Sequence, residues 1–162
     1  MALISTIGGT TSNSYVSQSE ASAYFAGRLG VSEWTSATSS EKDAALMMAT
    51  VRLEAEYYAG LRVYADQRLQ WPRIGTYDRD GIQHSSSSIP LIVQQATFEY
   101  ALALLREPTL LDDTGLNAFA NVKMGSLDVT PRSVSATTLP ALVKQLIAPV
   151  RLGGMSTPVA RA

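Results

Sequence analysis

Residues 40–60 read SEKDAALMMATVRLEAEYYAG, and this stretch decides the fold class. The positions that recur at intervals of four, three and four residues are Leu46, Thr50, Leu53 and Tyr57. This spacing places them on one face of an α helix, and Met47 and Val51 broaden the same face. The stretch therefore predicts a long amphipathic helix.

Residues at both ends of this stretch indicate where the helix begins and ends. Ser40 precedes Asp43 by three residues, which predicts a capping box, with Asp43 in the place that Glu or Gln usually takes. Gly60 follows Tyr58 and Ala59, and a glycine just past a helix commonly takes the left-handed conformation that ends it. We expect the helix to run from about residue 40 to Gly60.

An earlier helix is predicted at about residues 18–29. Ser17 and Glu20 form a second capping box, and apolar residues follow at helical spacing. Gly30 closes this helix, and a short connecting turn with Trp34 follows.

Two prolines open two further helices, because a proline at the first turn lacks only an N–H that would have no partner there. The helix from Pro90 has an apolar face made of Val93, Ala96, Thr97, Tyr100, Ala101 and Leu104, and Pro108 sets its end. The helix from Pro140 has apolar residues at Leu142, Val143, Leu146, Ile147 and Val150, and it stops at Gly153 and Gly154. Both patterns favour helices that pack against the helix predicted at residues 40–60.

The remaining segments predict a long loop and a small β-hairpin. Between residues 61 and 89, Pro72, Gly75 and Gly81 exclude a continuous helix, yet large apolar side chains in this loop require a packing partner. Residues 122–129 alternate apolar and polar around a Gly-Ser pair, which is typical of a hairpin. The predicted fold class is mainly α: a bundle of about four helices with an aromatic loop and a small hairpin.

Length and composition favour one soluble domain. With 162 residues, we expect an extended N-terminal arm at 1–16, a single helical domain at 17–153 and a C-terminal tail at 154–162. There is no cysteine, and we find neither a signal-peptide pattern nor an apolar run long enough to span a bilayer. Charged residues make up 17%, against about 25% in typical domains, which suits a surface covered by neighbouring proteins.

Charge is distributed unevenly along a chain whose net charge is −1. Residues 1–61 carry three basic against six acidic side chains, whereas residues 123–162 carry five basic side chains against Asp128 alone. Opposed potentials of this kind orient protein association, although chance alone also produces such differences in small sets of charges.

The residue types that carry catalysis lack the surroundings that catalysis needs. His84 is the single histidine and stands in a serine-rich segment, without the orienting carboxylate and oxyanion hole of a triad. Asp78, Asp80 and Gly81 resemble half of a calcium loop, but Ile89 stands where the closing Glu would be, so an Asp/Gly turn is the better interpretation. We therefore expect no enzyme and no catalytic, cofactor or metal site.

The loop also suggests binding of a single nucleic-acid strand. Arginines at 62, 68, 73 and 79 alternate with Tyr64, Trp71 and Tyr77, and basic groups beside aromatic rings are typical of strand-binding surfaces. Acidic residues in the same segment reduce its charge to +1, and Trp71 is equally well suited to anchor the loop on the core. Both interpretations stay open at this point.

One motif carries a family resemblance. Residues 69–78 read LQWPRIGTYD, and an Asn-Ser-Tyr-Val segment at 13–16 and Trp34 precede them. In this order, from about 13 to 153, the chain resembles short tailed-phage proteins often labelled DnaT-like single-stranded-DNA-binding proteins. These proteins are also similar to head–tail connector, or adaptor, proteins that form a ring beneath the portal.

The resemblance implies two functions. As a connector, the chain would be a structural virion protein of the phage neck, assembled in the host cytoplasm as a ring of twelve copies. It would join the portal to a downstream tail or neck protein and line the channel through which genome DNA passes without sequence-specific binding. As a DnaT-like protein, it would bind single-stranded DNA in replication. A near-neutral chain favours the connector, because affinity for DNA comes from neutralised phosphates.

The connector interpretation selects candidate contact residues. We expect the helices that include residues 40–60, 90–107 and 140–152 to form the core, with the first helix and the loop against neighbours. Aromatic and arginine side chains dominate protein interfaces, so the interface candidates are Trp71, Arg73, Tyr77, Arg151 and Arg161. The last two belong to the positive C-terminal part, which we expect to reach the portal.

Overall fold

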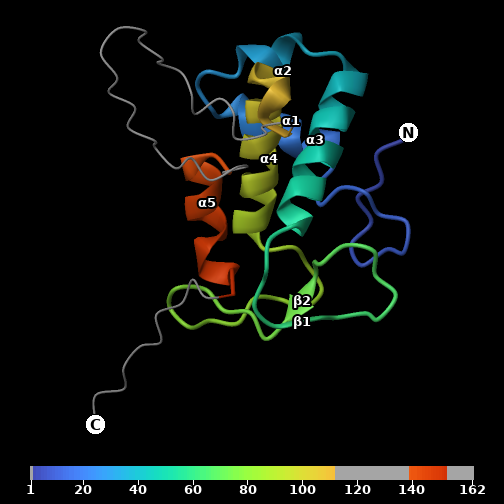
Figure 1. Ribbon diagram of the computed structural model, residues 1–162, viewed down its shortest axis with the longest axis vertical. Helices are drawn as coiled ribbons and strands as arrows, with labels where there is room; N and C mark the ends of the chain where they lie inside the picture. The colour runs from blue at the N-terminus through green and yellow to red at the C-terminus, as the bar shows by residue number, and fades with distance from the viewer. Residues whose placement is uncertain (1, 112–138, 153–162) are drawn as a thin grey trace, which may run out of the picture.

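The computed structural model describes residues 2–111 and 139–152, and within them the chain is mainly helical (Figure 1). The α helices are α1 (Gln18–Ala26), α2 (Ser32–Ser36), α3 (Ser39–Glu54), α4 (Leu91–Arg106) and α5 (Ala141–Ile147). The shorter elements are β1 (Leu61–Arg62), β2 (Arg73–Ile74) and the 3-10 turns η1 (Pro108–Leu111) and η3 (Ala148–Val150). The predicted fold class is confirmed.

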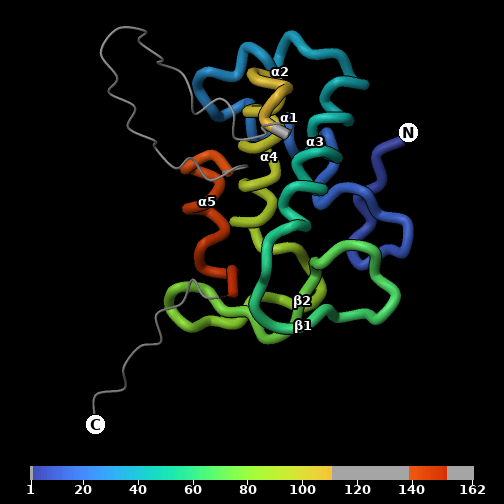
Figure 2. The backbone as a smooth tube through the Cα atoms, viewed as in Figure 1, coloured from blue at the N-terminus to red at the C-terminus, as the bar shows by residue number. Residues whose placement is uncertain are grey.

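Helix α4 is the centre of the fold, and it packs against both α3 and α5 (Figures 1 and 2). All six residues of its predicted apolar face are buried, which confirms that face. Pro90 is its N-cap, and the helix ends at Arg106, two residues before Pro108. The apolar period of 3.6 residues therefore located the helix and part of its buried surface, while Phe98, Glu99 and Leu102 outside the predicted face are buried as well.

Helix α3 is present, but its ends differ from the prediction. Its capping box consists of Thr38 and Glu41, not Ser40 and Asp43, because Ser39 is already helical and Glu41 occupies the third helical position. The helix ends at Glu54, so Gly60 lies beyond it, with a φ of 70° in a tight turn. The predicted box lies two residues after the observed one, and the box that contains a glutamate is the one that forms.

The buried face of α3 was predicted only in part. Leu46, Thr50 and Leu53 are buried as expected, whereas Val51 is 67% exposed. Tyr57 is 79% exposed, because the chain leaves the helix before it and Tyr58 turns inward instead.

The N-terminal helices cover one end of α4. The capping box of Ser17 and Glu20 is confirmed, and α1 ends at Gly27 rather than near Gly30. The segment with Trp34 is a short helix, α2, rather than a turn, and the Trp34 ring packs against Phe25 with ring centroids 4.8 Å apart. Helix α1 therefore contributes to the core instead of only facing neighbours.

An ion pair ties α1 to α4. Arg28 donates from Nε and Nη2 to the two carboxylate oxygens of Glu99, at 2.6 and 2.7 Å. The Tyr24 hydroxyl donates to the same carboxylate at 2.8 Å. Burial and the hydrogen bond to Glu99 together raise the pKa of Tyr24 to about 12. These bonds satisfy a carboxylate that is buried in the helix interface.

Residues 2–16, expected as an extended arm, contain no helix or strand. The segment folds back on itself, since Asn13 accepts from the Ile4 amide at 2.7 Å and donates to the Ala2 carbonyl at 2.8 Å. Tyr15 and Val16 are buried against the helices. The predicted hairpin at 122–129, the helix stop at Gly153 and Gly154, and the tail at 154–162 lie outside the described residues.

Candidate docking surface at the loop end

The loop between α3 and α4 closes one end of the molecule. Strands β1 and β2 pair antiparallel within it, with Leu61 opposite Ile74 and Arg62 opposite Arg73. The C-terminal segment runs beside residues 57–59, because Ala59 donates to the Val150 carbonyl at 2.9 Å and Leu152 donates to the Tyr57 carbonyl at 2.8 Å. Two distant parts of the sequence, the loop and the C-terminal segment, therefore meet at this end, which we call the loop end.

Trp71 holds the loop on the core. Its side chain is 1% exposed, and its ring meets the Tyr58 ring edge-on with centroids 5.5 Å apart. The peptide bond between Trp71 and Pro72 is cis. Of the two interpretations of this tryptophan, the structure supports the intramolecular one.

Arg73 joins the loop to the chain that leaves α3. Its Nε donates to the Ala59 carbonyl at 2.7 Å, and its Nη2 donates to the carbonyls of Gly60 at 2.7 Å and Tyr58 at 3.2 Å. Its Nη1 donates to the Gln70 carbonyl at 3.3 Å. Burial lowers the pKa of Arg73, which is 8% exposed. A planar guanidinium can reach carbonyls on several sides at once, so this arginine serves as the clamp of the turn.

A carboxylate at the end of α3 connects the helix to both the loop and the N-terminal segment. Glu54 accepts a hydrogen bond from the Tyr15 hydroxyl, and its Oε1 also accepts from the Gln70 amide at 2.8 Å. Burial raises the pKa of the Glu54 carboxyl, while these two hydrogen bonds oppose the shift.

A second carboxylate holds the C-terminal segment. Glu56 is 9% exposed, and its two oxygens face Arg52 Nη1 at 2.9 Å and Arg151 Nη2 at 2.6 Å. Because Arg151 comes almost a hundred residues after Glu56, this pair joins two segments that are far apart in the sequence. The sequence analysis missed Glu56, and the only signal for it was a charged residue next to an expected helix end.

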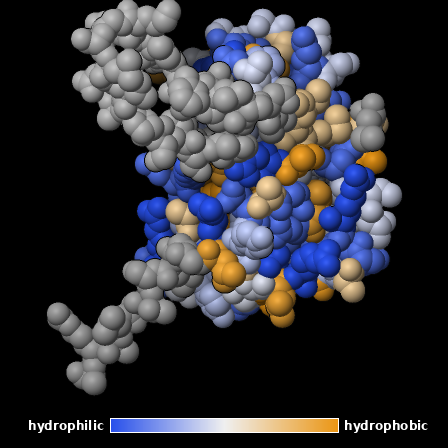
Figure 3. Space-filling view, in the orientation of Figure 1, coloured by the Kyte–Doolittle hydropathy of each residue, from blue (hydrophilic) through white to orange (hydrophobic). Residues whose placement is uncertain are grey.

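The outer surface of the loop end is rich in apolar side chains. Large exposed ones are Tyr57, Leu61, Ile74, Tyr77, Ile82 and Leu152, with exposed fractions between 41% and 79%. We call these six residues the loop-end surface. Figure 3 shows hydrophobic residues among hydrophilic ones on the face of the molecule seen in Figure 1, including the end with β1 and β2. Exposed apolar side chains mark a site of protein interaction where they form one contiguous patch.

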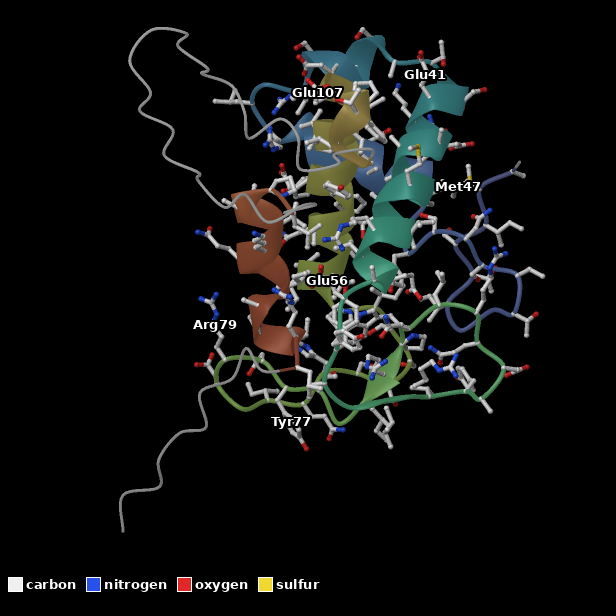
Figure 4. All side chains as sticks on the ribbon, viewed as in Figure 1. Glu41, Met47, Glu56, Tyr77, Arg79 and Glu107 are labelled. Carbon is white, nitrogen blue, oxygen red and sulfur yellow. The ribbon has the colours of Figure 1, made fainter. Side chains whose placement is uncertain are left out.

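Basic and acidic side chains alternate around this surface. Arg62, Arg68 and Arg79 are exposed, and so are Asp66 and Asp80. Figure 4 shows Tyr77 and Arg79 pointing outward at the loop end, while Glu41 and Glu107 lie at the opposite end of the molecule. The exposed charges of the loop therefore nearly balance, and they form no strongly positive face.

Asp78 was considered for metal binding and His84 for catalysis, and the structure shows hydrogen bonds of both residues. Oδ1 of Asp78 accepts from the amides of Asp80 at 2.9 Å and Ile82 at 2.8 Å, which confirms the predicted Asp/Gly turn. The His84 amide donates to the Thr76 carbonyl at 2.9 Å. Across residues 2–111 and 139–152, no three His, Asp or Glu side chains gather in a way that could hold a metal ion. None of the helices in the same ranges combines the length and hydropathy of a membrane span.

The structure separates the five interface candidates. Trp71 and Arg73 lie inside the subunit, so their side chains offer no contact surface in this conformation. Tyr77 is 41% exposed and belongs to the loop-end surface. Arg151 is partly exposed and is paired with Glu56. Arg161 lies outside the described residues.

These features define a small, mainly helical protein whose Trp-Pro-Arg loop is an internal structural device. The chain matches, over residues 1–162, the model of the family described as "Putative DnaT-like ssDNA binding protein", and it belongs to this family. No curated protein and no solved structure matches the chain.

Proposed function

We propose that this chain is a structural virion protein, a head–tail connector that assembles as a ring of twelve copies between the portal and the tail. The observation that carries the proposal is which side chains of the loop end are buried and which are exposed. Its tryptophan and its clamp arginine are used inside the subunit, and the side chains left outside are six large apolar groups among charges that nearly balance. A surface of this composition suits a protein partner better than a phosphate backbone.

In this proposal the loop-end surface docks on the portal or on the downstream neck protein. The Glu56–Arg151 ion pair places Arg151, one of the basic residues of the C-terminal part, at the same end of the molecule. The ring would line the DNA channel without base-specific contacts. Apolar contact would supply the affinity, and the charges around it would orient the partners.

Substitution in the loop-end surface tests the docking. Leu61→Glu places a charge at a 73% exposed position, and we expect it to weaken binding to purified portal by about tenfold or more, since a buried unpaired charge is costly. Leu29→Glu is the matched control, because Leu29 is 93% exposed and follows α1 rather than the loop. The masses of the chain, the portal and their mixture, measured by sedimentation, give both binding and copy number. Equal portal binding by the two variants would contradict the proposed docking site.

Single-strand binding is the second candidate, and the description of the family favours it. Arg62, Arg68 and Arg79 are exposed in the same loop as Tyr64 and Tyr77, which are 48% and 41% exposed. If three phosphates were neutralised, the logarithm of the affinity for an oligonucleotide would fall with the logarithm of salt concentration with a slope of about −2. If a monomer bound an oligonucleotide with this salt dependence and did not bind the portal, single-strand binding would replace the connector proposal.

A further inference from the structure

Helix α3 has apolar residues on two opposite faces. One face holds Leu46, Ala49 and Leu53 and is buried against α4. The other holds Ala44, Met48, Val51 and Ala55, at intervals of four, three and four residues. At 3.6 residues per turn, these four stand within about 60° of one another, opposite the buried face. We call them the outer stripe of α3.

Within residues 2–111 and 139–152, nothing covers Met48, Val51 and Ala55 of the outer stripe. Val51 is 67% exposed and Met48 is 40% exposed, and Ala55 is exposed as well. A helix that is apolar on both faces is normally buried on both. Its spacing also matches the contact seam of two packed helices, where small residues such as Ala44 and Ala55 allow close approach.

Helix α5 presents a neutral outer face on the other side of the core. Ala141 and Gln145 are exposed and Leu142 is 46% exposed, while Val143 and Ile147 face inward. In Figure 1, α5 and α3 stand on either side of α4. The subunit therefore has two different helical faces on opposite flanks.

The charges beside these two faces are complementary. The carboxylates of Glu41 and Asp43 flank the N-terminal end of the outer stripe. Lys42 of the same turn has its ammonium 5.7 Å from the centre of the Trp34 ring, so its charge is turned toward its own chain. Helix α5 contains Lys144 and no carboxylate.

We infer that the outer stripe of α3 docks on the outer face of α5 in a second copy of this chain. Contacts between two different faces are heterologous, and repeated around a closed rotation they generate a ring. The inference rests on the proposed ring and names the faces that would build it. Lys144 of one copy would lie near Glu41 and Asp43 of the next and fix the direction of the contact.

The chain has no cysteine, so single introduced cysteines can report which faces meet. Val51→Cys and Leu142→Cys are purified separately, mixed at equal concentration, oxidised with copper–phenanthroline, and resolved on non-reducing gels. We expect the mixture to give a disulfide-linked heterodimer, and each variant alone to stay largely monomeric. Ser22→Cys, at an exposed position on α1, measures random collision when it is mixed with Leu142→Cys. Thermal melts establish that each variant is folded.

Three outcomes would overturn this interface. A Val51→Cys homodimer would indicate a two-fold contact between outer stripes, and a Leu142→Cys homodimer would indicate a contact between α5 faces. Heterodimer no more abundant than with Ser22→Cys would show that the two faces do not meet. If the wild-type chain forms a ring with the portal and the cysteines do not link, the connector proposal stands and this interface is wrong. If the cysteines link and the portal is not bound, self-association stands and the proposed partner is wrong.

Discussion

Replacing Arg73 tests whether the Trp-Pro-Arg loop is a structural device. Arg73→Lys keeps the positive charge but loses the planar fork that reaches four carbonyl oxygens from three nitrogens. If about two of these hydrogen bonds are lost, at roughly 1–1.5 kcal/mol each, the variant should be less stable by about 2–3 kcal/mol. Arg73→Met leaves all four carbonyls without this donor and should lose about 4 kcal/mol or more.

Urea denaturation followed by circular dichroism measures these differences, and thermal melts provide a second readout. For a chain of this length, each kcal/mol corresponds to a Tm shift of about 2–4 °C, so Arg73→Lys should melt roughly 4–12 °C below the wild type. Arg79 supplies matched controls, because it is exposed and points outward in Figure 4. Arg79→Lys and Arg79→Met should stay within about 0.5 kcal/mol of the wild type.

The same four variants distinguish a structural arginine from a DNA contact. A phosphate contact depends on charge, so a DNA-binding Arg73 would tolerate lysine in stability and lose oligonucleotide affinity with methionine. If Arg73 is a structural clamp, the lysine variant already loses stability. Equal unfolding midpoints for Arg73→Lys, Arg73→Met and the wild type would refute the clamp.

Three further tests probe other contacts, each measured by urea denaturation. Gly60→Ala should cost about 2 kcal/mol or more, because φ is +70° and a Cβ would come within 2.2 Å of a carbonyl oxygen of β2; Gly81→Ala, with φ of +81° and open space, should cost only about 1–2 kcal/mol. The Glu54 carboxyl has a folded pKa above its ordinary value of 4.5, so its contribution to stability is lost as pH rises from that value through the folded pKa. Glu54→Gln should therefore gain stability relative to the wild type between pH 4 and 7. Parallel pH profiles of the two proteins would contradict this. Thr38→Ala should cost about 1 kcal/mol through loss of the cap of α3, and Ser40→Ala should cost clearly less, so equal losses would disprove the assigned capping box.

Much of the secondary structure follows from local chemistry. The six residues of the predicted apolar face of α4 are all buried, because they recur at the helical period, although Phe98, Glu99 and Leu102 are buried as well. The cap of α1 and the turn at Asp78 were also predicted, since both depend on side chains that bond to amides two to four residues away. In these cases the interacting groups are neighbours in the chain.

The sequence could not decide which side of an element faces inward when both sides carry apolar residues. On α3, Val51 and Leu53 are similar in hydropathy, and packing against α4 buries one and leaves the other outside. Tyr57 and Tyr58 are adjacent and chemically identical, and the early end of the helix selects the second for the core.

The sequence by itself determined a helical chain, the position of its main helices and a loop that has to pack on something. Tertiary structure decided that Trp71 is core, that Arg73 binds carbonyls, and that Glu56 meets Arg151 from the far end of the chain. The physical reason is the same in each case. A helix or a turn depends on contacts within a few residues, whereas the burial of an aromatic ring or the pairing of a charge depends on segments that only the folded chain brings together.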